Sequence, residues 1–403
     1  DPSDIIYTSG STKAPKGVVL THDMLMRSAY ASCLNRGFEK GRRIFIPLPM
    51  FHVYGYVEGM LAAILVGGAV LFRRGKFAAE PVLQFMKAEG ANDILSVPAQ
   101  MMSLISYLKE NFVELPELHA VYCSAAVCPS WVWPSIRKYL GVSDVITGYG
   151  MTEVCGASMQ TAPDDGDEIL ESRVGKLLPG GCSGEKAYGG HQIAYRVADQ
   201  KTGEDCRPGE VGELWCKGSV VMKCYFNREE ANRRVFTEDG WFKTGDQADL
   251  SDAGRIRIQG RIKDIILTST GEKIPPTDME LAIQTDPLFE QVMVVGEARP
   301  FITALAVVNE AEWEKFAKEF NVDPTDERML MRRDIRMAAL KRLKKAASRF
   351  PQYGIPRNIR LLKEHWTVDN GCLTVTMKLR RPIIREKLRA EIDELYTVPQ
   401  NNV

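Results

Sequence analysis

The chain has 403 residues, 45% of them hydrophobic, so it is long enough for two or three domains and can bury a substantial core. Lysine plus arginine and aspartate plus glutamate both number 52, so no overall charge attracts nucleic acid or an anionic membrane. Nine cysteines without CxxC pairs favour a reduced, cytoplasmic protein over a disulfide scaffold.

Residues 5–159 alternate short apolar runs with segments of helix length. The runs are rich in β-branched residues and read "DIIYTS", "RIFIPLP", "AVLFR", "DILSVP", "AVYCSA" and "DVITGYG". This alternation predicts a parallel sheet covered by helices, with ligands beyond the carboxyl ends of the strands.

The most apolar stretch is "GMLAAILVGGAVLF", residues 59–72. A membrane span needs about 20 apolar residues, and this stretch is shorter and contains a Gly-Gly pair. It predicts a buried helix, a turn and a buried strand. The chain also starts with acidic residues, unlike a signal peptide.

Residues 174–260 form short runs separated by glycine, such as "HQIAYRVAD", "GEVGELWCKG", "GWFKTGDQADL" and "GRIRIQG". They predict antiparallel or barrel-like β structure. Beyond this region come two further strand-like runs, "QVMVVGEA" and "FITALAVVN". We therefore expect a large α/β domain with a barrel-like segment over 1–262 and a smaller α+β domain over 263–403.

A long helix is predicted over residues 326–350, and it carries many basic side chains. A membrane or nucleic-acid surface is one interpretation. Acidic segments flank the helix, however, and Met331, Ile335, Leu340 and Leu343 suit a stripe that faces a core. We therefore favour a solvated helix face, and no nucleic-acid partner is expected.

Residues 8–17, "TSGSTKAPKG", follow the first predicted strand. Glycine permits unusual backbone angles, amides and hydroxyls can surround an anion, and lysine adds charge. The spacing differs from the common P-loop, because Gly17 is followed by Val18 and not by Lys-Ser/Thr. By itself the segment fits a polyphosphate-binding loop or a flexible surface loop.

Seven blocks, in the same order, resemble motifs of the adenylate-forming superfamily, which includes acyl-CoA synthetases, luciferases and nonribosomal adenylation domains. The blocks are "YTSGSTKAPKGV" (7–18), "PLPMFHVYG" (47–55), "GYGMTE" (148–153), "GELWCKG" (212–218), "DGWFKTGD" (239–246), "GRIKDIILTSTGEKIPP" (260–276) and "LTVTMKLRR" (373–381). They span almost the whole chain. The resemblance implies that a carboxylate attacks the α-phosphate of ATP, which gives acyl-AMP and pyrophosphate.

The resemblance also implies a phosphate-binding loop. The loop would hold the β- and γ-phosphates of ATP and so stabilise the charge of the leaving group. Its residues are Ser9, Gly10, Ser11, Thr12 and Lys16.

By the same resemblance, Tyr149 stacks on adenine, Thr152 binds the α-phosphate and Glu153 holds Mg²⁺, which prefers hard oxygen ligands. Asp246 would accept both ribose hydroxyls, since a carboxylate has two oxygens. Alternatively, residues 148–153 form an ordinary Gly-rich turn with a surface glutamate, and Asp246 is a turn aspartate that binds no ligand.

Lys378 is the implied catalytic cation, reaching between the carboxylate and the α-phosphate as the transition state forms. Its neighbours Arg380 and Arg381 are also cationic, and we interpret both as surface charge.

Three further residues near the predicted domain boundary take roles from the resemblance. Arg261 would contact the ribose or a phosphate. Lys263 matches a hinge about which the small domain swings between an adenylating and a thioester-forming pose. Gly271 would then be brought to the face where a pantetheine arm enters.

His52, after the predicted strand "RIFIPLP", would gate an acyl pocket and contact the carboxylate of the acid. A packed core histidine is the alternative. The pocket itself would use Tyr54, Gly55, Val57 and the turn at 123–127, whose small side chains leave room without naming a substrate.

Family members carry a long portion of the large domain before the phosphate loop, whereas this sequence starts at that loop. We expect a truncated adenylation domain with uncovered apolar sheet surface, which predicts aggregation, a partner chain or a missing amino-terminal segment supplied elsewhere. A homodimer is also left open.

The leading function is an ATP-dependent acid:CoA ligase for a fatty or other apolar acid, with ATP, Mg²⁺ and CoA as cofactor and cosubstrates. The ending "LTVTMKLRRPIIREKL" resembles the long-chain acyl-CoA synthetase branch. One alternative passes the acyl group to an amine or to a carrier-protein thiol. Another is a non-catalytic nucleotide-binding module, against which the presence of Lys378 argues.

Overall fold

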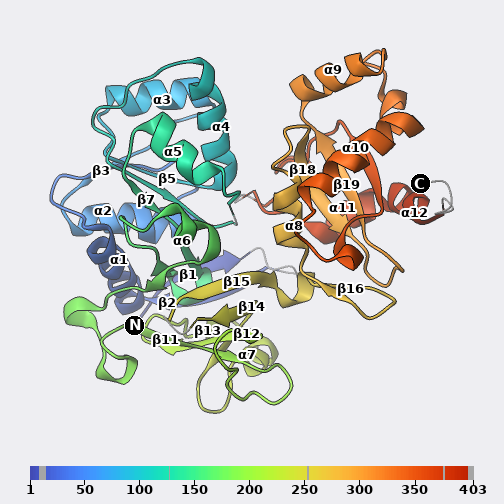
Figure 1. Ribbon diagram of the computed structural model, residues 1–403. Coiled ribbons are helices and arrows are strands. Elements are labelled where there is room, and N and C mark those ends of the chain that lie inside the picture. The colour runs from blue at the N-terminus through green and yellow to red at the C-terminus, as the bar shows by residue number, and fades with distance from the viewer. Residues whose placement is uncertain (9–14, 127, 252–253, 375–376, 398–403) are drawn as a thin grey trace. The chain divides into compact units, whose positions relative to one another are not determined.

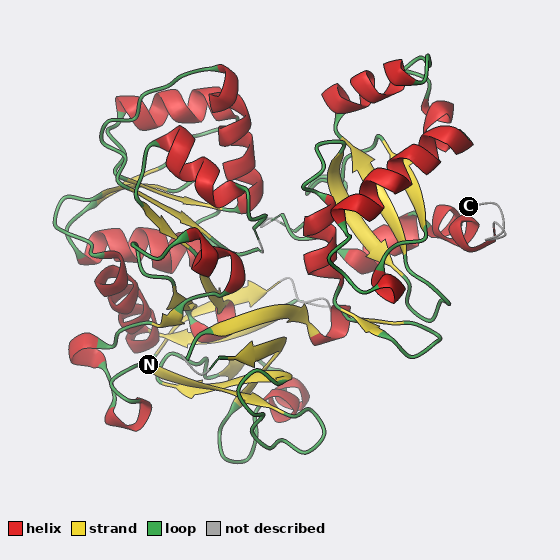
Figure 2. Ribbon diagram, in the orientation of Figure 1, coloured by secondary structure: helices red, strands yellow, loops and turns green. Residues whose placement is uncertain are grey.

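The computed structural model describes the chain in five stretches, residues 1–8, 15–126, 128–251, 254–374 and 377–397. Its contacts divide it into two compact units, Asp1–Ile258 and Gln259–Val403, each of which is described by itself below. Figures 1 and 2 show the elements of both units.

The first unit contains a parallel sheet of five strands in the order β4-β3-β5-β6-β7. The strands are β3 (Arg43–Phe45), β4 (Ala69–Leu71), β5 (Asp93–Ser96), β6 (Ala120–Cys123) and β7 (Asp144–Ile146). They come from five of the six predicted runs, so the expectation of a parallel sheet is confirmed for these runs.

Helices cover both faces of this sheet, as Figure 1 shows. Alternate strand residues face opposite layers: Ile94 packs with one set of helices and Leu95 with the other. The first set is α3 (Ala79–Ala88), α4 (Pro98–Glu110) and α5 (Val132–Leu140). The second set is the π-helix η1 (Tyr54–Leu61) and α2 (Ala62–Leu65), against which α1 (His22–Arg36) packs.

The apolar stretch 59–72 forms a helix, a turn and a strand, as predicted. The turn needs glycine at both positions, because Gly67 has a φ of +66° and a Cβ on Gly68 would lie 2.4 Å from the Arg42 carbonyl oxygen. Across the part of the chain that the structure describes, no helix has the length and apolar character to cross a membrane.

The first predicted run does not join the parallel sheet, so this part of the prediction was wrong. Strand β1 (Pro2–Thr8) pairs antiparallel with β2 (Lys16–Thr21), which also pairs with β13 (Cys224–Tyr225). Only seven residues separate β1 from β2, and a parallel pairing would need a crossover connection of a dozen or more.

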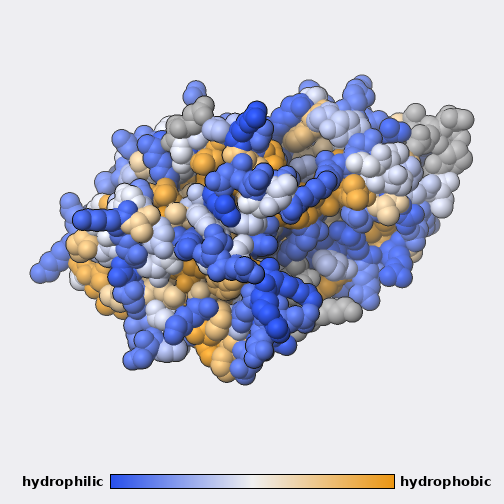
Figure 3. Space-filling view, turned by 90° about the horizontal axis from the view of Figure 1, so that it is seen from below, coloured by the Kyte–Doolittle hydropathy of each residue, from blue (hydrophilic) through white to orange (hydrophobic). Residues whose placement is uncertain are grey.

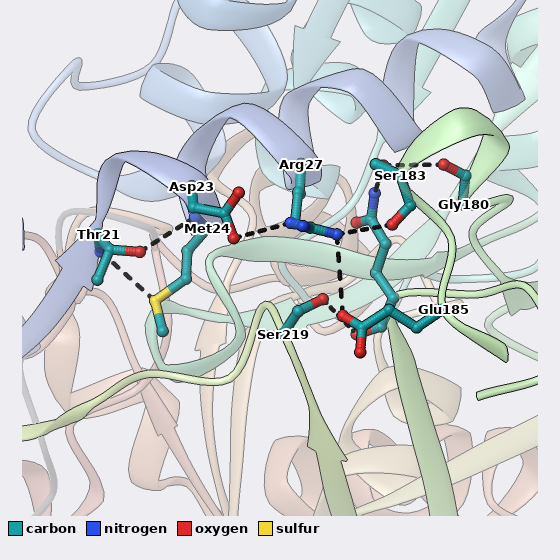
Figure 4. Close-up of polar contacts among 9 residues, drawn as sticks. Thr21, Asp23, Met24, Arg27, Gly180, Ser183, Glu185 and Ser219 are labelled. Carbon is teal, nitrogen blue, oxygen red and sulfur yellow. Dashed lines mark hydrogen bonds and ion pairs between the residues drawn. The ribbon is translucent and has the colours of Figure 1, made fainter. Parts of the chain in front are cut away.

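Helix α1 begins with a side-chain cap and is tied to a distant loop (Figure 4). The Thr21 hydroxyl accepts a hydrogen bond from the Met24 amide at 3.2 Å. Arg27 pairs with Asp23 at 2.8 Å and donates to the carbonyl of Ser183 at 2.7 Å. These contacts fix the helix to the turn η3 (Gly181–Ser183).

A second sheet follows β7, in the order β10-β9-β8, with antiparallel pairings. A Cβ on Gly150 would lie 1.8 Å from the Gly156 carbonyl oxygen, so the approach of β8 and β9 requires glycine there. The elements are β8 (Gly148–Met151), η2 (Thr152–Val154), β9 (Gly156–Gln160), α6 (Asp167–Ser172) and β10 (Lys176–Leu177).

The region 174–260 contains a four-stranded sheet in the order β11-β12-β14-β15, and the β11-β12 and β12-β14 pairings are antiparallel, as predicted. Its elements are η4 (Lys186–Tyr188), β11 (Ile193–Ala198), β12 (Val211–Gly218), α7 (Glu229–Val235), β14 (Phe242–Leu250) and β15 (Ile256–Arg261).

Some large hydrophobic side chains of the first unit are exposed. On β1, Ile5 and Tyr7 are 42% and 65% exposed. Figure 3 shows hydrophobic residues at several separate places among hydrophilic ones on the face seen from below. A partner chain or a homodimer at such a surface stays a prediction.

The second unit is built on a sheet in the order β18-β19-β20, in which β18 and β19 are antiparallel and β19 and β20 are parallel. Both predicted strands are present. The strands are β18 (Phe289–Val295), β19 (Thr303–Val308) and β20 (Asn358–Leu362), and a hairpin of β16 (Ile266–Leu267) and β17 (Lys273–Ile274) precedes them.

Each face of this sheet carries its own helices and its own apolar cluster. One face packs against α8 (Pro276–Ile283), α9 (Glu310–Glu319) and α10 (Arg333–Ala346). The other packs against α11 (Arg381–Lys387), α12 (Arg389–Thr397) and the buried side chains of Trp366, Cys372 and Leu373.

The helix predicted over 326–350 is interrupted, so its predicted extent was wrong. A 3-10 helix, η6 (Glu327–Met331), and α10 are separated by Arg332, whose ψ of 131° is extended. The break lets Leu330 reach the core while α10 starts anew. Of the predicted stripe, Ile335, Leu340 and Leu343 are buried and Met331 is half-buried.

Candidate functional site

Two predicted site residues from different sheets of the first unit meet. Tyr149 on β8 donates its hydroxyl to Oδ2 of Asp246 on β14, at 2.5 Å. Both side chains are buried, and the ring of Tyr195 packs edge-on against Tyr149 with the centroids 6.2 Å apart. The fold therefore joins an aromatic ring and a carboxylate that lie 97 positions apart in the sequence.

The backbone around Asp246 is held by local contacts. The Asp246 amide donates to the Thr244 hydroxyl at 3.1 Å, and that hydroxyl donates to the Leu214 carbonyl at 2.7 Å. Between them Gly245 has a φ of +72°. The register of β12 and β14 shifts at this place, so the strand is locally distorted where Asp246 turns inward.

Lys16 and Glu153 lie on two sides of one tyrosine, Tyr225 on β13. The Tyr225 hydroxyl donates to Oε1 of Glu153 at 2.8 Å. The Lys16 ammonium lies 4.5 Å from the centroid of the Tyr225 ring, a cation–π distance. Asn232 fixes Tyr225 by bonding both its amide and its carbonyl. A cation and a carboxylate are thus placed at one spot.

Tyr225 was not predicted as a site residue. It lies in "MKCYF", between two of the family blocks, where an aromatic residue has many ordinary explanations. Its importance depends on the pairing of the two-residue strand β13 with β2, which the sequence pattern does not indicate.

The remaining members of the predicted phosphate loop, Ser9, Gly10, Ser11 and Thr12, lie outside the described residues. Thr152 is described, and it starts the short helix η2 with its side chain buried. Within the described residues, the structure therefore places Lys16, Thr152 and Glu153 in the larger unit.

His52 lies just before the π-helix η1 and is half-buried. Its Nδ1 accepts a hydrogen bond from the Tyr54 amide at 3.2 Å, so a neutral ring carries its proton on Nε2. The His52 amide and carbonyl bond to Pro49 and Tyr56, which fixes the backbone at this position.

The side chains expected to line an acyl pocket are packed tightly. Tyr54 donates its hydroxyl to the carbonyl of Tyr122 at 2.8 Å, and burial raises the pKa of that hydroxyl well above its ordinary value. Val57 is fully buried, and a Cβ on Gly55 would lie 2.8 Å from the Pro49 carbonyl oxygen. Val127 of the predicted turn lies outside the described residues, and the role of these residues stays a prediction.

The π-helix η1 also contains a buried carboxylate that was not predicted, that of Glu58. It accepts hydrogen bonds from the Ser32 hydroxyl at 2.5 Å, the Ala157 amide at 2.8 Å and the Gln160 amide group at 3.0 Å. Burial raises the pKa of Glu58 above its ordinary value. Glu58 is the one charged residue between 53 and 72, which is the sequence signal that could have identified it.

The other predicted site residues belong to the second unit. Arg261 is the last residue of β15, and Lys263 is exposed in the 3-10 turn η5 (Ile262–Asp264). Gly271 lies between β16 and β17 with a φ of +92°, a conformation that favours glycine.

Lys378 is exposed near the end of a small hairpin, residues 372–380. The Thr374 amide donates to the Lys378 carbonyl at 2.9 Å, and the Lys378 amide donates to the Thr374 hydroxyl at 3.1 Å. Residues 375–376 lie outside the described residues. The hairpin therefore presents the Lys378 side chain on a bonded backbone.

The interpretation of Arg381 as surface charge was wrong, whereas Arg380 is exposed as predicted. Arg381 is 7% exposed, and its guanidinium makes two hydrogen bonds to the carboxylate of Glu280, at 2.7 and 2.5 Å. Arg381 is the first residue of α11, and that helix packs on the sheet, which turns this side chain inward.

Among the described residues, no group of three or more His, Cys, Asp or Glu side chains could hold a metal ion. Glu153 offers a hard carboxylate oxygen of the kind that Mg²⁺ prefers. A magnesium ion there would take its other ligands from phosphate oxygens and water, which is how proteins commonly bind Mg²⁺.

Comparison with known proteins assigns both units. The model of the AMP-binding enzyme family matches residues 1–226, and the model of the AMP-binding enzyme C-terminal domain matches residues 263–399. The chain belongs to the AMP-binding enzyme family. The predicted resemblance to adenylate-forming enzymes is thereby confirmed, as is the predicted fold of a large α/β domain followed by a smaller one.

Curated relatives of this AMP-binding enzyme are named as acyl-CoA ligases. The mitochondrial medium-chain acyl-CoA ligase ACSF2 of Danio rerio is 31% identical over 298 residues, which cover 73% of this chain and 47% of the relative. The long-chain-fatty-acid–CoA ligase FadD15 of Mycobacterium bovis is 29% identical over 431 residues, covering 98% of this chain and 69% of the relative.

A solved structure agrees with this AMP-binding fold. The o-succinylbenzoate CoA synthetase of Bacillus subtilis, in complex with the acyl-adenylate intermediate OSB-AMP, has a TM-score of 0.74 and 26% identity. The match covers 94% of this chain and 68% of that protein. The chain spans about half the length of the Danio rerio ligase and about two thirds of the Bacillus subtilis synthetase.

Proposed function

We propose that this AMP-binding enzyme activates a carboxylic acid with ATP, forming acyl-AMP and pyrophosphate, and then transfers the acyl group to CoA. The observation that carries the proposal is the hydrogen bond between Tyr149 and Asp246. Tyr149 lies three residues before Thr152, and the next residue, Glu153, contacts Tyr225, whose ring also contacts Lys16. An aromatic ring, a ribose acceptor and charges for a polyphosphate are thus available together in the larger unit.

In this proposal the nucleoside binds beside the hydrogen-bonded pair of Tyr149 and Asp246. The tyrosine ring supplies a flat apolar surface for adenine. The Asp246 carboxylate has about four lone-pair sites, so it can accept ribose hydroxyls while it keeps the hydrogen bond from Tyr149. Arg261 is proposed to contact the ribose or a phosphate.

The triphosphate is proposed to lie against Lys16 and Thr152, together with the loop that contains Ser9 to Thr12. The Lys16 ammonium stabilises the charge that grows on departing pyrophosphate. When bound, Mg²⁺ supplies charge neutralisation at the phosphates. Glu153 would hold it, and Tyr225 keeps the Glu153 carboxylate oriented through its hydroxyl.

Lys378 is proposed to bridge the carboxylate of the acid and the α-phosphate. Two anions must approach each other in this reaction, so a cation between them lowers the barrier by stabilising the transition state. His52, with its Nε2 proton, is proposed to contact the carboxylate of the acid from the acyl side. Lys263 is proposed as the hinge of the second step.

CoA is proposed as the acceptor, with Gly271 near the entering pantetheine arm, and the acid is proposed to be fatty or similarly apolar. The support is that relatives are named as medium-chain and long-chain CoA ligases. A relative from Bacillus licheniformis is named for 2-succinylbenzoate, so an aromatic acid belongs in any substrate screen.

The test is a panel of acids given to the chain with ATP and Mg²⁺, with AMP release measured with CoA, with amines and without an acceptor. We expect AMP release in the presence of one or more fatty acids. CoA should stimulate this release, and an acyl-CoA thioester should form. No AMP release or acyl-AMP with any acid contradicts the ligase. Release stimulated by amines and not by CoA contradicts the acceptor.

We also propose a reducing compartment such as the cytoplasm for this protein. All nine cysteines are free, and five of them are buried. Unpaired thiols in this number fit a reducing environment. A homodimer or a partner chain is proposed as cover for the exposed side chains of β1, and sedimentation of the purified chain would detect the homodimer.

A further inference from the structure

The hairpin that carries Lys378 is held to the second unit at its base. Leu373 and Leu379 form an isolated antiparallel bridge, and the Arg380 amide donates to the Cys372 carbonyl at 2.8 Å. Cys372 and Leu373 are buried in the cluster under α11 and α12. The first arm of the hairpin is therefore anchored by apolar packing.

The second arm runs directly into Arg381, which is anchored by charge. Its guanidinium forms two parallel hydrogen bonds with the Glu280 carboxylate, and the side chains are 8% and 6% exposed. Oε1 of Glu280 also accepts the amide of Val294, at 2.7 Å. Val294 lies on β18, an edge strand of the sheet, so Glu280 bonds an amide of that edge strand as well as Arg381.

The pair joins two layers of the unit. Glu280 lies on α8, which packs on one face of the sheet through Met279 and Ile283. Arg381 starts α11, which packs on the other face through Ile384. We call the Glu280–Arg381 ion pair the clasp. It fixes Arg381, three residues after Lys378, to the helix layer on the opposite face of the sheet, past the edge strand β18.

We propose that the Glu280–Arg381 pair is a positioning device that holds the Lys378 hairpin in place for adenylation. The role of Lys378 rests on the proposed function, whereas the anchoring of the hairpin does not. Arginine suits this task because its planar fork binds a carboxylate in two places and so fixes direction as well as distance. Neither residue touches substrate in this proposal.

The test uses a double variant, Glu280→Gln with Arg381→Met, in the 403-residue chain. Removing one partner alone would strand a buried charge and destabilise the fold strongly, whereas removing both leaves no buried charge. The glutamine oxygen can still accept the Val294 amide. The double variant therefore removes the clasp and keeps the bond to the sheet edge.

A matched control exists in the same unit. Arg342 binds Asp286 in two places, at 2.9 and 2.6 Å, and Asp286 also accepts the amide of Leu288. The control variant Asp286→Asn with Arg342→Met removes a two-point pair that is more exposed, at 33% and 17% for Arg342 and Asp286, and keeps the same kind of amide acceptor. Neither of its residues is part of the hairpin.

Hydrogen exchange is the first measurement. We expect the amides of Thr374, Lys378 and Arg380 to exchange about tenfold faster in the Glu280/Arg381 double variant, while those of the central strand β19 keep their rate. The control variant should leave the hairpin unchanged. Hairpin exchange at the parent rate in the folded double variant overturns the proposal.

The two half-reactions supply the second measurement. We expect adenylation to fall about 100-fold, as a small misplacement of a catalytic group can do, while thioester formation from added acyl-AMP and CoA stays at the parent rate. Equal losses in both half-reactions, or in neither, contradict a positioning role. If the parent forms no acyl-AMP with any acid, the proposed function fails, and hydrogen exchange still decides whether the clasp anchors the hairpin.

A third variant covers failure of the double variant to fold. Arg381→Lys keeps the charge but replaces the two-point fork with a single ammonium. Faster exchange of the hairpin amides in this variant supports the two-point clasp, and parent-like exchange overturns it.

Discussion

Tyr225 serves two neighbours of opposite charge, since its hydroxyl bonds Glu153 and its ring carries the Lys16 ammonium. Removing the hydroxyl oxygen of Tyr225 separates these two contacts. In Tyr225→Phe the ring remains for Lys16, while Glu153 loses a hydrogen bond to its charged carboxylate. We expect the free energy of unfolding to fall by about 1–2 kcal/mol and adenylation to fall about tenfold.

Pyrophosphate exchange and urea unfolding would measure these effects, with the exposed Tyr7→Phe as the control. Unchanged adenylation in Tyr225→Phe would show that the orientation of Glu153 does not depend on this hydroxyl.

Glu58 gives a prediction about pH. Its folded-state pKa is raised by burial, so the folded state holds the proton more tightly than the unfolded state does. The resulting stabilisation is complete below the ordinary value of 4.5 and is lost as the pH rises through the raised pKa. Glu58→Gln removes this titration, so its stability relative to the parent should increase as the pH rises above 4.5.

Urea unfolding of parent and variant between pH 5 and pH 8 would measure this difference. The exposed Glu80→Gln serves as the control for the substitution itself. A difference between Glu58→Gln and the parent that is constant with pH would contradict a raised pKa.

The close pairing of strands β8 and β9 depends on glycine at position 150, which has no side chain. A Cβ on Gly150 would overlap the Gly156 carbonyl, so Gly150→Ala must separate the two strands. We expect a loss of about 1–3 kcal/mol of stability, and a weaker affinity for AMP because Tyr149 precedes Gly150 and Thr152 follows two positions later.

Calorimetry with AMP and thermal unfolding would test this. Gly166→Ala is the matched control, because its Cβ would meet no atom within 4 Å. Equal AMP affinities of parent and Gly150→Ala would mean that the strand contact does not position the site.

The elements that could be predicted from sequence are those whose pattern is local. The parallel strands are short β-branched runs, and the glycines at 67 and 68 mark a turn, so both were recognised. The antiparallel pairing of β1 was missed because its partner is decided by the length of the connection. The break at Arg332 was missed because basic residues on both sides continue a helical pattern.

Site residues divide in the same way. Candidates such as Tyr149 and Asp246 come from the family blocks, and the structure shows their contact, while their roles stay predictions. Tyr225 could not be predicted, since its partners come from distant parts of the chain. Glu58 was not predicted, although it is the one charged residue between 53 and 72. Arg381 was misinterpreted because a charged residue beside other charges is usually exposed, and its buried partner Glu280 is 101 positions away.

At the scale of the whole molecule, the chain consists of two units that divide between Ile258 and Gln259. The hinge proposed at Lys263 lies just beyond this division, in an exposed 3-10 turn. Brief digestion with trypsin should cut first after Arg261 or Lys263 and release two fragments, because few contacts cross a domain boundary.

Mass spectrometry of the first fragments would check this prediction. The double variant Arg261→Gln with Lys263→Gln should resist the cut. A first cut elsewhere in the chain, with the bonds after Arg261 and Lys263 intact, would contradict a hinge at Lys263.

The central claim is that this chain joins a carboxylic acid to AMP with the help of Lys378. The most direct measurement is acid-dependent exchange of labelled pyrophosphate into ATP, compared between the parent, Lys378→Ala and the exposed neighbour variant Arg380→Ala. We expect exchange in the parent and in Arg380→Ala, and a loss of at least about 100-fold in Lys378→Ala with ATP binding retained. Exchange at the parent rate in Lys378→Ala would contradict the claim.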